Sequence, residues 1–330
     1  MSAEADALVE RAAELIEAGK LGDAIAALDT ARPLYEREGD EGAIARCLQL
    51  SATACRLSGE LAPALERARE AERRAAPATP TRVASITEQG EVEILRGEHG
   101  AAADHYARAL EEGRGAGLLP DHAARLMRKR GMVLAAARRF EEASASMREA
   151  RALHEQTGAR TEARRAIVEL AVVLEQAGDG DAVERVIAEG LEVAGETGDA
   201  HVAADLELLA AGRAVQRKDL AAGLACARRA RAYALQATAV LSYISAVMSI
   251  ADICDATGDR AGAYEALASG WVTTGDAIGA DAARQVFEPK LTALRDAWGD
   301  AAFAAVRDAY NDRRRAILRG AAGGDPDHRA

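Results

Sequence analysis

Residues 131–151 read GMVLAAARRFEEASASMREAR, and this stretch contains the unit on which the chain is built. The pattern predicts the end of one helix, a tight corner at Arg138-Arg139, and a second helix with small residues at Ala143 and Ala150. Small side chains at this spacing let two helices approach closely, and larger ones would force them apart. The stretch therefore predicts a helical hairpin.

The same pattern recurs along the whole chain. We call the small residue early in the second helix of each hairpin its anchor. The anchors are Ala24, Ala64, Ala102, Ala143, Val183, Gly223, Ala263 and Ala304, with spacings of 40, 38, 41, 40, 40, 40 and 41 residues. Glycine, which favours a left-handed helix end, stands five residues before six of them, at Gly19, Gly59, Gly97, Gly178, Gly258 and Gly299. A constant period of this length predicts stacked helical repeats.

Composition agrees with an all-α fold. Aromatic residues are only 3% of the 330 residues while hydrophobic residues reach 49%, so helices with small side chains fill the core more readily than a sheet. The predicted hairpins lie near 3–40, 41–78, 80–118, 120–158, 159–198, 199–238 and 239–279, closed by a capping pair at 280–319. We expect one solenoid over 1–319 and a disordered tail at 320–330, which lacks apolar periodicity.

Two prolines disturb this scheme. Pro33 falls inside the second helix of the first hairpin, and Pro289 falls inside the first helix of the last one. Proline lacks a backbone N–H and clashes with the preceding turn. We expect a kink or a late helix start at both positions.

The alternation of small and large residues resembles tetratricopeptide repeats. It is carried by Gly131, Phe140, Ala143, Met147 and Ala150, and again by Gly90, Ala102, Tyr106 and Ala109. The period departs from the common unit of about 34 residues and is similar to a longer class found in bacterial peptide-sensing regulators and polarity adaptors. HEAT-type repeats share this length, but the glycine corner favours the tetratricopeptide alternative. The resemblance implies a right-handed α–α superhelix with a concave groove lined by the first helix of each pair.

No motif for catalysis or metal binding is present. The sequence contains no phosphate loop, no H-E-x-x-H and no G-x-S-x-G, so we expect neither an enzyme nor a cofactor. His99 and His105 are six residues apart and fall on different helical faces, which favours ordinary exposed histidines over a metal site. The four cysteines have no paired spacing, which favours buried thiols.

The net charge is −11 and the pI is about 5.2, which argues against non-specific nucleic-acid binding. The N-terminus is acidic and helical from its start, so we expect no signal peptide. The most apolar run, residues 240–250, is too short and too polar to span a membrane. These features predict a cytoplasmic protein that binds neither nucleic acid nor membrane.

The resemblance also implies which side chains would meet a partner. Aligned on the anchors, the groove positions are Arg46, Gln49, Thr53, Arg56, Thr87, Glu91, Arg125, Arg128, Lys129, Met132, Arg165, Val168, Val172, Glu175, Met248 and Asp252. The Lys/Asn pattern with which chaperone-binding members hold a terminal carboxylate is missing from these positions. We therefore expect a different class of partner.

The fourth hairpin carries an excess of positively charged residues. Residues 121–160 hold nine Lys/Arg against five Asp/Glu, a balance of +4 in an acidic chain. Such an island can steer an acidic partner. The same charges can equally be solvated helix faces joined by ion pairs one turn apart.

The aromatic residues gather near the C-terminus, with eight of eleven at or after Tyr233. They can fill the core of the closing repeats or form an interface. The second alternative predicts a dimer or partner surface near Trp271 and Trp298.

Together these features predict a non-enzymatic interaction scaffold or adaptor that binds a partner peptide or helix in its groove. The alternative is a regulatory protein in which a bound peptide or small molecule alters the activity of a partner by contact. An RNA-binding helical repeat is disfavoured by the acidic pI.

Overall fold

The computed structural model describes residues 3–322, and within this range the chain forms sixteen α-helices and no strand. The helices are α1 Ala3–Glu17, α2 Leu21–Glu38, α3 Glu41–Leu57, α4 Leu61–Arg74, α5 Pro80–Leu95, α6 His99–Gly115, α7 Pro120–Ala136, α8 Phe140–Gln156, α9 Arg160–Ala177, α10 Gly180–Thr197, α11 Ala200–Gln216, α12 Leu220–Gln236, α13 Val240–Ala256, α14 Arg260–Ile278, α15 Ala280–Trp298 and α16 Asp300–Ala322. From α3 onward the first helices begin at 41, 80, 120, 160, 200, 240 and 280. The predicted all-α class and the period near 40 residues are confirmed.

The corners inside the hairpins are left-handed, as the glycine pattern predicts. The six glycines five residues before an anchor all have positive φ, between 72° at Gly19 and 85° at Gly59. Arg138 and Lys218 occupy the same corner position in their hairpins, with φ of 61° and 63°. The corner geometry is therefore kept even where a side chain makes it unfavourable.

The late helix starts expected at Pro33 and Pro289 are wrong. Both prolines lie inside continuous helices, α2 and α15. On the two sides of Pro33, Ala31 and Tyr35 are buried, and Phe287 beside Pro289 is fully buried. Packing of these neighbours offsets the lost backbone hydrogen bond, because most helix stability in a protein comes from its packed face.

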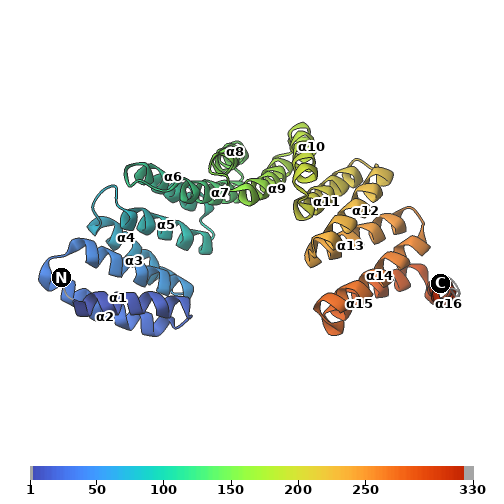
Figure 1. Cartoon of the computed structure of the whole chain (residues 1–330), viewed down its shortest axis with the longest axis horizontal. Coiled ribbons are helices and arrows are strands. Elements are labelled where there is room, and N and C mark those ends of the chain that lie inside the picture. Colours follow the sequence, from blue (N-terminus) through green and yellow to red (C-terminus); the bar gives the residue numbers. More distant parts are fainter. Residues whose placement is uncertain (1–2, 323–330) are drawn as a thin grey trace, which may run out of the picture. The chain divides into compact units, whose positions relative to one another are not determined.

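The chain forms two compact units, an N-terminal unit, Met1–Val183, and a C-terminal unit, Glu184–Ala330. Within the N-terminal unit, the first helices α5 and α7 lie on one side and their partners α6 and α8 on the other (Figure 1). We call the surface formed by α1, α3, α5, α7 and α9 the first-helix face.

The core of each unit is built on small residues where helices pack closely. The anchors Ala24, Ala64, Ala102 and Ala143 have no exposed surface. A Cβ on Gly131 would lie 2.9 Å from Cγ of Met147, so a larger residue here would force the Met147 side chain between α7 and α8 to move. Larger side chains such as Tyr106 and Phe287 fill the space between these close approaches.

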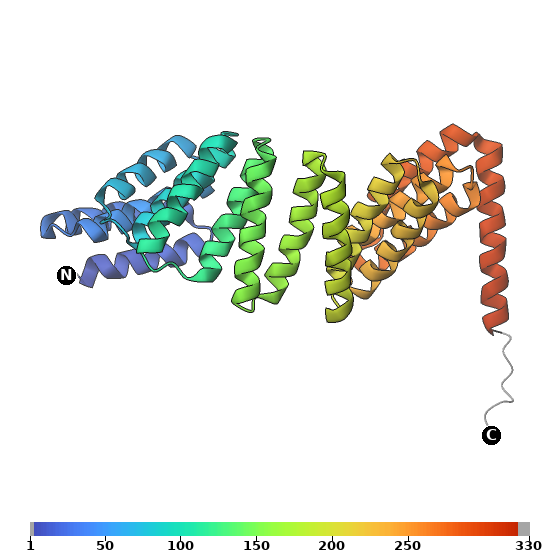
Figure 2. The ribbon, with the colours of Figure 1, turned by 90° about the horizontal axis from the view of Figure 1, so that it is seen from above.

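The last helix ends later than the sequence predicts. We expect the capping pair to stop at 319, but α16 continues to Ala322. Its C-terminal half projects beyond α14 and α15 (Figure 2), and residues 312–317 are exposed. The rest of the predicted disordered tail, residues 323–330, lies outside the described residues. Across residues 3–322, no helix is both long and apolar enough to cross a bilayer.

Candidate protein-interaction site

A cleft of about 630 Å³ opens on the first-helix face of the N-terminal unit. Its lining comes from α3 (Gln49), from α5 (Pro80, Val83, Ala84, Thr87 and Glu88), from the connection between α6 and α7 (Ala116, Gly117, Leu118 and Leu119) and from α7 (His122, Arg125, Leu126 and Lys129). The volume falls within the range of ligand-binding pockets, roughly 300–1,000 Å³. Apolar side chains thus share this cleft with polar side chains from three consecutive repeats.

Four of the predicted groove residues line this cleft, namely Gln49, Thr87, Arg125 and Lys129. The others in the N-terminal unit lie on α3, α5, α7 or α9 outside its lining: Arg46, Thr53, Arg56, Glu91, Arg128, Met132, Arg165, Val168, Val172 and Glu175. Met248 and Asp252 lie on α13 in the C-terminal unit.

The carboxylate of Glu88 in the cleft is buried and fully engaged. One oxygen accepts a hydrogen bond from the Thr53 hydroxyl at 3.0 Å, and the other meets the Arg56 guanidinium at 2.5 Å. Thr53 and Arg56 lie on α3, so these bonds join the second repeat to the third. The two predicted groove residues therefore position the cleft wall instead of facing an open groove.

Lys129 is also held by a neighbouring repeat. Its ammonium pairs with Glu91 on α5, and the same carboxylate accepts a hydrogen bond from the Tyr106 hydroxyl at 2.8 Å. Burial alone would raise the pKa of Glu91, but the hydrogen bond and charge of Lys129 outweigh it and lower the pKa. Burial raises the pKa of Tyr106, and the Glu91 carboxylate raises it further. Glu91 is therefore held ionised by its partners.

The basic excess of residues 121–160 is largely matched by acids on adjacent helices. Arg128 pairs with Glu169 on α9 at 2.5 Å, and Arg139 pairs with Asp104 on α6 at 3.5 Å. Arg125 differs, because among the described residues its only ion pair is with Asp121 on its own helix at 3.4 Å, and its side chain is 51% exposed. The structure thus separates charges that join repeats from a charge that faces solvent.

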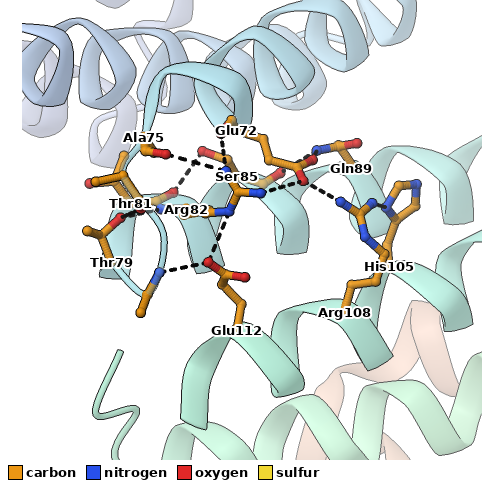
Figure 3. Close-up of polar contacts among 12 residues, drawn as sticks. Glu72, Ala75, Thr79, Thr81, Arg82, Ser85, Gln89, His105, Arg108 and Glu112 are labelled. Atoms are coloured by element: carbon orange, nitrogen blue, oxygen red, sulfur yellow. Dashed lines mark hydrogen bonds and ion pairs between the residues drawn. The ribbon is translucent and has the colours of Figure 1, made fainter. Parts of the chain in front are cut away.

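A polar network fixes the start of α5, which forms one wall of the cleft (Figure 3). The Arg82 guanidinium donates to the carbonyl of Glu72 at 2.9 Å and lies 3.0 Å from a carboxylate oxygen of Glu112. The same Glu112 oxygen accepts from the backbone N–H of Ala78 at 2.7 Å, and Gln89 donates to Glu72 at 2.7 Å. The network ties α4, α5 and α6 together around the irregular connection at 75–79.

Sequence reasoning missed the rim made by Leu118 and Leu119, the buried Glu88, and the support from Arg82. Two signals point to the rim. An apolar pair precedes Pro120 in a connection, and Leu119 is 62% exposed there. The two anchor spacings on either side of Ala102, 38 and 41 residues, also depart from 40 at this repeat.

The aromatic residues of the C-terminal unit make most of their contacts within that unit. The Trp298 indole N–H donates to Asp255 at 2.7 Å, and the Trp298 ring lies 6.0 Å from the Phe303 ring. Trp271 is half-buried and packs against the core of this unit. The Asp252 carboxylate pairs with Lys290. Pairing of two copies near Trp271 and Trp298 stays a prediction.

The histidines expected to be exposed are both partly buried. His105 lies beside Arg108, with 3.3 Å between Nδ1 and the guanidinium. Burial lowers the pKa of His105, and the Arg108 charge adds to this effect. Within residues 3–322, no group of three or more His, Cys, Asp or Glu side chains is placed to hold a metal ion.

No family model and no curated protein matches the sequence. Solved structures do match the fold. The C-terminal part of a tetratricopeptide-repeat protein from Cytophaga hutchinsonii has a TM-score of 0.56 at 12% identity, and the match covers 82% of this chain and 99% of that part. The apo form of RapI has a TM-score of 0.54 at 14% identity, covering 87% and 99%. Aspartyl phosphate phosphatase F from Bacillus subtilis has a TM-score of 0.50 at 12% identity, covering 83% and 70%.

At these identities the likeness concerns the fold alone. It agrees with the helix pairs, the left-handed corners and the small anchors of this chain. The chain is a helical-repeat protein with the tetratricopeptide-repeat fold.

Proposed function

We propose that this chain is a non-enzymatic interaction module that binds a segment of a partner protein in the cleft between α3, α5 and α7. The observation that carries this proposal is the cleft itself, since three consecutive repeats contribute to one concave surface of about 630 Å³. Val83, Ala84 and Leu126 offer apolar contact, and Gln49 and Thr87 offer hydrogen bonds to a peptide backbone.

The cleft is built before any partner arrives. The Arg82 network fixes the start of α5, and the Glu88 pairs fix its distance from α3. A preformed site loses little conformational entropy on binding, so a few contacts suffice for useful affinity. Glu88 is buried and bonded to Thr53 and Arg56, which leaves it unsuited to act as a base on a bound substrate.

The test is a selection of displayed random peptides on the full-length chain, with each enriched peptide then measured by titration. The proposal predicts saturable binding that is abolished by Ala84→Arg, which fills the cleft. Leu119→Arg, at an exposed rim position, is a second blocking variant that cannot disturb a core. Selected peptides that bind both variants as well as the unchanged chain would contradict the proposal.

The same cleft volume fits a short peptide or a small molecule, and one structural relative is described as an apo form. We therefore keep a second function, in which such a ligand alters the activity of a partner by contact. A change in radius of gyration on addition of a selected peptide would favour this regulator. Identical scattering with and without a saturating peptide would favour the scaffold.

A further inference from the structure

Three exposed arginines occupy one repeated position on the first-helix face. The residue 18 positions before the anchor is Arg46 in the second repeat, Ala84 in the third, Arg125 in the fourth and Arg165 in the fifth. Equivalent residues of stacked repeats point in the same direction. The row of arginines is therefore interrupted once, at Ala84, and Ala84 lines the cleft.

The ion pairs of these arginines leave them available to a partner. Among residues 3–322, Arg125 pairs only within its own helix. Arg165 pairs with Glu162 on α9 at 3.6 Å, and its side chain is 58% exposed. Exposed pairs of this kind contribute little and exchange readily. Arg46 is exposed and, among the described residues, has no ion pair. By contrast, Arg56, Arg128 and Lys129 are held by carboxylates of neighbouring repeats.

The acidic residues of the first-helix face do not lie equally close to the three arginines. Glu88 and Glu91 are neutralised by Arg56 and Lys129. Asp6 and Glu10 line a separate small pocket together with Arg46, and the Asp6 carboxylate accepts the Tyr35 hydroxyl at 2.6 Å. Within residues 3–322, Arg46 thus lies near two acids without a direct ion pair, whereas Arg125 and Arg165 each pair with an acid of their own helix.

We propose that the cleft selects an acidic segment with one apolar anchor residue, an inference that rests on the proposed peptide-binding function. The apolar side chain enters the cleft at Ala84, and carboxylates on either side meet the arginines. Directly packed helices lie about 8–10 Å apart, and an extended chain advances about 3.3 Å per residue. In the described chain α3 packs on α5, whereas α5 and α7 flank the cleft without packing closely on each other. The acid that meets Arg46 therefore stands about three residues from the anchor, and the acids that meet Arg125 and Arg165 stand about three or more residues from it on the other side.

The test uses fluorescently labelled peptides of the form E-x-x-L-x-x-E-x-x-E, its reverse, and versions with four or five residues between Leu and the following Glu, with Ser and Thr at the intervening positions. Anisotropy titrations on the full-length chain are expected to show binding in one direction. Replacing the three Glu residues by Gln should weaken binding about tenfold, and replacing Leu by Ser should weaken it by about tenfold or more. Binding should also weaken with added salt, because exposed charges are screened.

Substitutions in the chain test whether the three exposed arginines bind the acidic peptide. Arg46→Gln, Arg125→Gln and Arg165→Gln should each weaken binding of the acidic peptide about threefold. The matched control is Arg114→Gln on α6, whose side chain is 77% exposed and, in the part of the chain that the structure describes, pairs only with Glu111 one turn away. This control should leave the affinity unchanged.

Two outcomes overturn the inference. If the Gln peptide binds as tightly as the Glu peptide, the occupant is an apolar segment without acids, while peptide binding in the cleft still stands. If neither peptide saturates the chain, the acidic pattern is wrong, and the library selection decides separately whether the cleft binds peptides at all.

Discussion

Lys129 on α7 and Glu91 on α5 form an ion pair between consecutive repeats, although they stand 38 residues apart in the sequence. Tyr106 on α6 donates to the same carboxylate, so three helices meet at one acidic side chain. Lys129 also lines the cleft. The ion pair that holds the repeats together is thus part of the surface proposed to bind a partner.

The first prediction concerns the pH dependence of stability. Glu91 has a lowered pKa in the folded chain, so its contribution is present above the ordinary Glu value of about 4.3 and is lost as pH falls through the folded pKa. In Lys129→Met the buried carboxylate loses its cation, which raises the pKa of Glu91 and disfavours its ionised form. We expect the variant to be less stable than the unchanged chain at neutral pH, and this deficit to shrink as pH falls and Glu91 is protonated. Melting temperatures of both chains from neutral to acidic pH check this, and a deficit that stays constant or grows with acidity would contradict it.

Arg82→Leu should destabilise the N-terminal unit by roughly 1–3 kcal/mol, because it leaves Glu72 and Glu112 without their shared cation. Chemical denaturation with helicity as the signal measures the loss. The control is Arg73→Leu on α4, whose side chain is 65% exposed and, within residues 3–322, pairs only with Glu70. Equal losses of stability in the two variants would show that the network at the start of α5 stabilises the chain no more than an exposed ion pair does.

Thr238→Gly should stabilise the C-terminal unit by about 1 kcal/mol, because a left-handed conformation costs roughly that much for a residue with a Cβ. Thr238 stands in the corner between α12 and α13 with a φ of 52°, which a β-branched residue rarely adopts. Thr257 ends α13 with a φ of −92°, so Thr257→Gly should lower stability instead. Opposite signs in thermal melts support the assignment, and a loss in both variants contradicts it.

His154→Leu should raise stability at neutral pH by roughly 1 kcal/mol. The ring is fully buried in α8, and neither ring nitrogen has a hydrogen-bond partner in the described chain. The nearest carboxylate oxygen, on Asp121, lies 3.7 Å from Nδ1. The exposed His122 provides the control, since His122→Leu should leave the melting temperature unchanged. A lower melting temperature for His154→Leu would show that the imidazole makes a favourable contact.

The repeat pattern was predictable because every hairpin must bury small residues at the same positions. Ala143 and Ala150, taken from one stretch, are both buried, and the corner falls at Arg138-Arg139. The corner position also explains why Arg138 adopts a left-handed φ without being glycine. The repeat period was therefore sufficient to predict the fold class, the hairpins and the position of the corners.

The site was predictable only in part. Gln49, Thr87, Arg125 and Lys129 follow from the tetratricopeptide resemblance together with the register of the anchors, and they line the cleft. Pairings such as Arg128 with Glu169 depend on the rotation between neighbouring repeats, which a repeat length does not specify. The rim at Leu118 and Leu119 lies in an irregular connection, where no period applies.

The central claim is that recognition occurs in the cleft between α3, α5 and α7. The most direct measurement is photo-crosslinking of a selected peptide that carries a photoreactive group at its apolar anchor residue, followed by mapping of the attached residues by mass spectrometry. The account predicts crosslinks to residues 80–84 and 116–126. Crosslinks that instead fall on the second helices α4 and α6, or on the C-terminal unit, would contradict it.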